Sequence, residues 1–140
     1  MNTAKYALFA IVLLCAIPVV SETHSVPGGI RLLPGFVHRS HQGIDSRVGE
    51  IVGTSGLRIL YDIGEMAGVY TNCKTCGWID GELWRRKQQI DGHQVVIVYT
   101  KARRIIVSFP ESKANFYATA NSRSDITDVL LMVLTFHDSR

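Results

Sequence analysis

Two apolar runs separated by three residues limit the fold of this chain more than any other feature. Residues 93–100, "HQVVIVYT", and 104–109, "RIIVSF", are rich in Val and Ile and flank Lys101-Ala102-Arg103. Runs of this length and composition predict a hairpin, or two adjacent strands. Because apolar residues follow one another instead of alternating with polar ones, we expect both faces of the sheet to be covered.

Two helices are expected to supply that cover. Thr54 or Ser55 can cap the first, which is expected to end near Asn72. Its small and apolar residues recur at helical spacing. They are Leu57, Leu60, Tyr61, Ile63, Gly64, Ala67, Gly68 and Tyr70.

The second helix follows a loop that is expected at 113–121, and its start is clearer. Ser122 with Asp125 three residues later forms a variant of the capping box. The apolar residues that follow lie at the spacing of an amphipathic helix: Ile126, Val129, Leu130, Val133 and Leu134. Strands covered by helices predict an α/β fold.

The N-terminal residues predict a secretory signal peptide at 1–21. Lys5 precedes an apolar stretch from Tyr6 to Val20, and Val19-Val20-Ser21 is a workable cleavage site. The alternative is a membrane anchor, but the apolar stretch is shorter than the roughly 20 residues that a spanning helix needs. We therefore expect a secreted product without a stable membrane span.

Charge and composition argue against several partners. Removal of residues 1–21 leaves 14 basic and 12 acidic residues, a formal charge of +2. That charge is too small to indicate a nucleic-acid or membrane partner. Basic residues at 85–87 could form a patch with Lys101, Arg103 and Arg104, but no nucleic-acid recognition motif accompanies them. The oligomeric state stays open.

The segment 22–53 is predicted to be an irregular lead because Gly and Pro interrupt it repeatedly. Its pair His38 and His41 could hold a metal ion, but a metal site needs three or four ligands. We expect solvated loop histidines, no metal and no cofactor. The remaining 54–140 would form the folded domain.

Cys73 and Cys76 are the only cysteines of the expected mature chain. A zinc site usually has a second cysteine pair, which this sequence lacks. In a secreted chain the spacing favours a short structural disulfide.

No catalytic set is visible in the sequence. The nearest approach to the G-x-S-x-G nucleophile motif is Gly53-Thr54-Ser55-Gly56, which has the wrong spacing. Nothing places a Ser, a His and an Asp together. Phosphate-binding loops and zinc-protease motifs are also missing.

The order of motifs resembles the N-terminal part of secreted, fungal-type class 3 lipases, which are α/β-hydrolases. The resemblance covers roughly residues 57–136 and is carried by "LRILYDIGEMAGVYTN", by the CxxC, and by "QQIDGHQVVIVYTKARRIIVSFPES". Within the first segment, Tyr61, Ala67 and Tyr70 match the family's early helix. The resemblance implies a partial α/β-hydrolase-like sheet with helices packed on it, in a lipase-like domain at 54–140.

The resemblance also implies site residues. Phe109-Pro110-Glu111-Ser112 matches the family's Phe-Arg-Gly-Ser/Thr, so Ser112 would belong to the oxyanion hole. Pro110 and Glu111 depart from the family, and Ser112 as an ordinary loop residue remains the alternative. A lipid-facing lid would follow within 113–134, with Phe116, Tyr117 and Ile126 as candidates.

Two functions follow from this sequence. The first is an N-terminal fragment or truncated relative of a class 3 lipase, whose parent would hydrolyse acylglycerols at a lipid–water interface. It would be inactive alone, because the nucleophile motif is missing from these residues. The second is a small secreted binding or interaction protein without catalysis.

Overall fold

A computed structural model describes residues 26–138, and the predicted signal peptide lies outside the described residues. Seven strands form one sheet in which every neighbouring pair is antiparallel. The strands are β1 (Phe36–His41), β2 (Arg47–Gly53), β3 (Arg58–Ile63), β4 (Glu82–Ile90), β5 (His93–Thr100), β6 (Arg104–Phe109) and β7 (Ala114–Thr119). Within the described range there is one α-helix, α1 (Arg123–Val133), and the 3-10 turns η1 (Pro27–Gly29), η2 (Glu65–Ala67) and η3 (Tyr70–Asn72).

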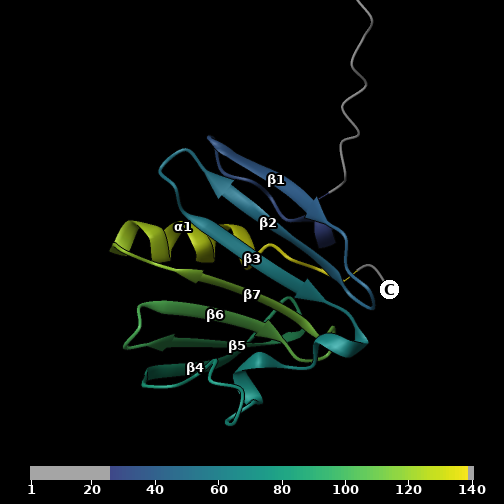
Figure 1. The fold of residues 1–140 in the computed structure, drawn as a ribbon, viewed down its shortest axis with the longest axis vertical. Helices are drawn as coiled ribbons and strands as arrows, with labels where there is room; N and C mark the ends of the chain where they lie inside the picture. The colour runs from purple at the N-terminus through teal and green to yellow at the C-terminus, as the bar shows by residue number, and fades with distance from the viewer. Residues whose placement is uncertain (1–25, 139–140) are drawn as a thin grey trace, which may run out of the picture.

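The predicted α/β-hydrolase-like fold is therefore wrong. A hydrolase sheet is built from parallel strands joined by helical crossovers, whereas this sheet consists of two antiparallel meanders, β1–β3 and β4–β7. The strand order is β1-β2-β3-β7-β6-β5-β4, so the last strand of the second meander pairs with the last strand of the first (Figure 1).

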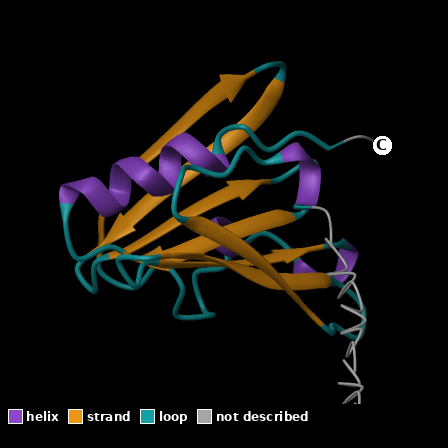
Figure 2. Cartoon of the chain, turned by 90° about the horizontal axis from the view of Figure 1, so that it is seen from above, coloured by secondary structure: helices purple, strands orange, loops and turns teal. Residues whose placement is uncertain are grey.

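The path of the chain explains this order. After β3 the segment 64–81 leads to the far edge of the sheet, where β4 begins. The second meander then returns strand by strand to β3, and α1 follows β7 across the sheet (Figure 2). We call the face packed by α1 the helix face, and the face under segment 64–81 the disulfide face.

The main core lies on the helix face. Inward residues of five strands pack against α1 and against Phe136, which follows it. Phe116 in β7 is fully buried, and its ring lies 5.3 Å from that of Phe136 and 6.0 Å from that of Phe109. Aromatic pairs at these separations add to the burial of apolar area, which supplies most of the folding free energy.

The two strands predicted from the apolar runs are confirmed, as is the expectation that both of their faces are covered. Val95 and Ile97 belong to the main core, while Val96, Val98 and Ile106 are equally buried on the disulfide face. A helix covers only the first of these faces. On the second, an irregular segment held by a disulfide replaces the expected helix.

The second predicted helix is also confirmed. The Asp125 amide donates to the Ser122 hydroxyl at 3.1 Å, and the Asp125 carboxylate accepts from the Ser122 amide at 3.1 Å. This reciprocal capping box fixes the start of α1. Val129, Met132 and Val133 form its buried side.

Three other expectations are wrong. The predicted helix at 54–72 is instead strand β3 followed by η2 and η3, and the lead at 22–53 contains β1 and β2. The predicted loop at 113–121 is largely β7, the strand that joins the two meanders. Each of these segments contains at least one strand whose alternation is masked by glycine, alanine or a neighbouring apolar residue.

Candidate functional site

A stack of aromatic rings lies on the disulfide face. The Trp78 ring centroid lies 4.4 Å from that of Tyr70 and 4.8 Å from that of Tyr117 on β7. The disulfide Cys73–Cys76, which confirms the predicted pairing, closes the loop between Tyr70 and Trp78. Segment 64–81 is thereby fastened to the centre of the sheet.

A buried amide holds the start of this segment. The Asn115 side chain is fully buried and accepts from the Tyr70 amide at 2.9 Å and from the Ser108 hydroxyl at 2.8 Å. Its nitrogen donates to the Gly68 carbonyl at 3.1 Å. One side chain thus satisfies backbone groups of a segment that has little regular structure of its own.

A second polar contact fixes the Tyr70 ring. Its hydroxyl donates to a carboxylate oxygen of Asp62 at 2.7 Å. Burial, followed by this hydrogen bond, raises the pKa of Tyr70 well above its ordinary value. The phenol therefore stays protonated and acts as a permanent donor to Asp62.

Beside the aromatic stack lies a cavity of about 440 Å³, which we call the arginine–tryptophan groove. Arg104 on β6 forms one side, with its guanidinium carbon 5.4 Å from the centre of the Trp78 ring. One nitrogen of Arg104 donates to the Gly77 and Trp78 carbonyls at 3.3 Å each. The side chains that line the groove include Arg58, Leu60, Trp78, Arg104 and Tyr117.

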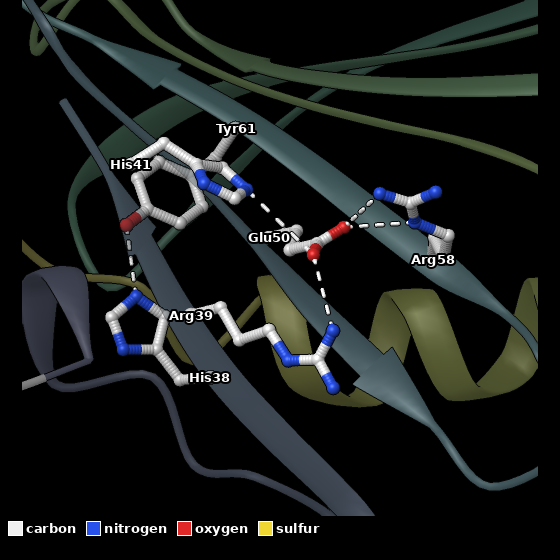
Figure 3. Close-up of polar contacts among 6 residues, drawn as sticks. All are labelled: His38, Arg39, His41, Glu50, Arg58 and Tyr61. Atoms are coloured by element: carbon white, nitrogen blue, oxygen red, sulfur yellow. Dashed lines mark hydrogen bonds and ion pairs between the residues drawn. The ribbon is translucent and has the colours of Figure 1, made fainter. Parts of the chain in front are cut away.

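The opposite side of the groove is formed by Arg58, which a buried carboxylate holds in place (Figure 3). Arg58 Nε donates to Glu50 Oε2 at 2.8 Å, and Nη2 contacts the same oxygen. The Glu50 side chain is only 4% exposed, whereas that of Arg58 is 61% exposed. The Arg58 guanidinium is therefore anchored by Glu50 and still accessible to solvent.

Two more basic side chains surround the same carboxylate. Arg39 and His41 of β1 each lie 3.7 Å from Glu50 Oε1. The hydrogen bond from Arg58 is the main reason why the pKa of Glu50 falls below its ordinary value, against the opposing effect of burial. One carboxylate thus faces two arginines and a histidine, so the cluster carries a net positive charge.

The histidine pair of the sequence analysis is split by the sheet. In the register of β1 with β2, His38 lies opposite Ile51 of the main core, whereas His41 lies on the other face, near Glu50. His38 is paired at 2.8 Å with the Tyr61 hydroxyl (Figure 3). Residues three apart in a strand point to opposite faces, so this pair cannot chelate one ion. Among residues 26–138 no group of three or more His, Cys, Asp or Glu side chains is arranged to hold a metal.

The Tyr61 hydroxyl can reach His38 because of a glycine. A Cβ at position 49 would lie 2.3 Å from that hydroxyl oxygen, so only glycine permits the approach.

The lipase-derived site residues lie in regular structure. Ser112 is buried in the hairpin turn between β6 and β7, where its amide donates to the Phe109 carbonyl at 3.2 Å. Phe116 belongs to the main core, Tyr117 to the aromatic stack, and Ile126 packs from α1 against the core. Their oxyanion and lid roles stay predictions. The four side chains are divided among a turn, the main core and the aromatic stack.

The sequence did not identify three residues of the groove: Arg58, Trp78 and Arg104. Arg104 was noted only as part of a basic patch, and it lies on β6 while residues 85–87 lie on the edge strand β4. One available signal was the alternation of side chains between the two faces of a strand at residues 58–62. Arg58-x-Leu60-x-Asp62 places three side chains on one face of a strand, and that face becomes the floor of the groove.

Comparison of the chain with protein-family models, with curated proteins and with solved structures finds no match. No helix within residues 26–138 is long and apolar enough to cross a membrane. The candidate site therefore has to be interpreted from its own geometry.

Proposed function

We propose that this chain is a secreted, non-catalytic binding protein whose arginine–tryptophan groove accepts a small anionic ligand with a planar apolar part. The observation that carries the proposal is the placement of Arg58 and Arg104 on either side of a cavity walled by Trp78 and Tyr117. Guanidinium groups recognise carboxylates and phosphates, and aromatic rings hold planar groups by stacking.

The groove is also prepared for binding before a ligand arrives. Glu50 holds Arg58, and the Gly77 and Trp78 carbonyls hold Arg104. Side chains that are already ordered lose less conformational entropy on binding, so more of the contact energy becomes affinity. This pre-ordering favours a ligand site over an unspecialised basic surface.

Calorimetric titration with phenyl phosphate tests the proposal, with phenol and inorganic phosphate as half-ligands. Because the ligand is small, we expect a dissociation constant on the order of 1 mM. Each half-ligand should bind at least about tenfold more weakly, because it satisfies only one part of the groove.

Variants locate the binding. Arg104→Gln should weaken phenyl phosphate binding about tenfold, while Arg123→Gln, an exposed arginine at the start of α1, serves as the matched control. Equal loss in both variants, or equal affinity for phosphate and phenyl phosphate, would contradict the proposal.

The lipase-fragment function, with acylglycerol hydrolysis by a longer parent and contact with a lipid–water interface, stays a second and untested proposal. The antiparallel sheet removes the support that an α/β-hydrolase fold would have given this function. The Ser112 amide also already donates to the Phe109 carbonyl within a turn. Because this chain would be inactive alone, the test is the coding sequence that follows the codon for Arg140. A reading frame with G-x-S-x-G after a strand would support this proposal, and a stop codon at that point would count against it.

A further inference from the structure

The edge strand β4 is the longest strand of the sheet, and its outer side has no neighbour among the described strands. Its nine residues, "ELWRRKQQI", are exposed except for Arg85 and Ile90, which are partly buried. An exposed strand edge presents unpaired backbone N–H and C=O groups to any other extended chain. We propose that β4 is a docking site for an extended acidic segment of a partner protein, which adds to the sheet as an eighth strand.

Charge decides between a partner and a second copy of this chain. Three consecutive cations, Arg85, Arg86 and Lys87, occupy the middle of β4, and Glu82 is its single carboxylate. Antiparallel pairing of two β4 strands centred on Arg86 would set these cations opposite one another. Like charges directly opposite in a sheet are destabilising, so the edge disfavours self-pairing and favours acidic side chains.

The cations differ in availability. Arg85 is already used, because its guanidinium pairs with Glu82 at 2.7 Å and donates to the Thr71 carbonyl at 2.9 Å. Arg86 and Lys87 are exposed and make no ion pair with the described residues. On the disulfide face Lys87 would meet a partner's carboxylates, and on the helix face Arg86 adds to the positive charge of the edge.

Grooves on both faces of β4 suit the alternating side chains of a docked strand. On the helix face a cavity of about 560 Å³ is lined by Trp84, Ile97, Leu130 and Leu134 together with Arg85, Arg86 and Gln88. On the disulfide face a cavity of about 640 Å³ includes Lys74, Asp80 and Lys87. A docked strand would place every second side chain in each groove.

The two linings specify the sequence of the partner. The helix-face groove offers an indole and three aliphatic side chains beside Arg85, Arg86 and Gln88, so it suits apolar side chains and disfavours cationic ones. The disulfide-face groove sets Lys74, Arg85 and Lys87 against Asp80 and Glu82. Arg85 is paired with Glu82, so the net positive charge that remains favours Asp or Glu. The fitting segment therefore alternates apolar and acidic residues.

The probe for this proposal is a fluorescein-labelled peptide of alternating Glu and Val residues, titrated with the full mature chain and followed by fluorescence anisotropy. A peptide of alternating Lys and Val controls for charge. A Glu-Val peptide with alternate backbone nitrogens methylated controls for edge pairing, because methylation removes the donors that β4 carbonyls would accept from. Saturable binding of the first peptide alone is the expected result.

Two variants with the same change in charge separate this edge from the rest of the surface. Lys87→Glu should weaken binding about tenfold, since an attraction becomes a repulsion. Arg123→Glu, at the exposed start of α1, should leave the affinity within about twofold because it lies outside the edge.

Hydrogen exchange of the wild-type chain gives a readout that needs no variant. Amides of residues 82–90 should exchange more slowly when the Glu-Val peptide is present. Absence of binding, equal binding of the methylated peptide, equal loss in the two variants, or unchanged exchange at 82–90 would each overturn the proposal.

Discussion

Two regions of the disulfide face each bury a polar side chain, and they satisfy it in opposite ways. Asn115 in β7 bonds to backbone and hydroxyl groups that are themselves enclosed under segment 64–81. Glu50 in β2 bonds to Arg58 and lies near Arg39. The Arg58 side chain is 61% exposed and that of Arg39 is 62% exposed. The first region uses fixed neutral partners, and the second uses charged partners in contact with water.

This difference separates structural from functional polar groups. A buried amide whose partners cannot reach water is costly to disturb, because each broken hydrogen bond leaves an unsatisfied group. A buried carboxylate with several hydrated partners can lose one of the outer partners at small cost, because the remaining ones still neutralise it. We infer that Asn115 fixes the architecture, while Glu50 holds Arg58 beside the groove and its outer partner Arg39 stays exchangeable.

The largest effect is expected at Asn115. Asn115→Ala should lower the free energy of unfolding by about 3 kcal/mol, because the Tyr70 amide and the Gly68 carbonyl lose their partner. Urea unfolding followed by circular dichroism measures this change. The exposed Gln94→Ala on β5 is the control, with an effect within about 0.5 kcal/mol. A loss below about 1 kcal/mol at Asn115 would mean that water replaces the amide.

The next effect concerns the disulfide over the same region. Replacement of Cys73 and Cys76 by serine should cost about 2 kcal/mol, the loop entropy expected for so short a closed loop. Thr75→Ala, inside the loop with the bond intact, controls for the substitution. Urea unfolding of the two variants gives the comparison. If both variants have equal stability, the disulfide adds nothing measurable, and the aromatic stack with the hydrogen bonds of Asn115 and Asp62 holds segment 64–81.

The strongest patterns in the sequence predicted the central hairpin, the capped helix and the disulfide. Their signals are local: β-branched runs, a Ser-x-x-Asp start and a cysteine pair in an expected secreted chain. The two apolar faces of the strands at 95–98 and 105–107 were also apparent, because their apolar residues are continuous. None of these signals indicates what covers the disulfide face, because the irregular segment 64–81 has no periodic pattern of apolar residues.

The missed strands show where local patterns fail. β3 was taken for a helix because Leu60 adds an outward apolar residue to the inward series Ile59, Tyr61 and Ile63. Gly64 and Gly68, counted as part of a helical face, in fact have positive φ: Gly64 follows the end of β3, and Gly68 follows the end of η2. The order β3-β7, and with it the groove, depends on pairing between residues far apart in the chain, which no local pattern encodes.

The hairpin before the central strands left a signal that was not used. Asp91 and Gly92 both have positive φ, and Ile90 pairs with His93 across them. Asp-Gly between strands is a strong indicator of a two-residue turn. It would have predicted β4 as the partner of β5.

A smaller effect is expected at Glu50. Glu50→Gln should cost about 1 kcal/mol at neutral pH, because its charged partners are largely solvated and can turn to water. Urea unfolding measures this loss, and Glu111→Gln in the exposed β6–β7 turn is the matched control. A loss equal to that at Asn115 would remove the distinction between the two regions.

Acid sharpens the same comparison. The pKa of Glu50 in the folded chain lies below its ordinary value of 4.5, so its ionised form stabilises the fold. This stabilisation is complete above the unfolded pKa and is lost as the pH falls through the folded pKa. We expect Glu50→Gln to flatten the decline in stability below pH 4.5, and Asn115→Ala to leave its slope unchanged. Thermal melts across that pH range measure both slopes.

The smallest effect is expected at Arg39, which tests how loosely the Glu50 cluster is held. Its guanidinium lies 3.7 Å from Glu50 and is 62% exposed, so Arg39→Ala should change the free energy of unfolding by less than about 0.5 kcal/mol. The remaining effect should fade in 1 M salt, where the screening length is about 3 Å. Urea unfolding at low and high salt measures both values. A loss near 2 kcal/mol that persists in high salt would place Arg39 in a dehydrated, fixed network, and the cluster would then resemble the Asn115 region.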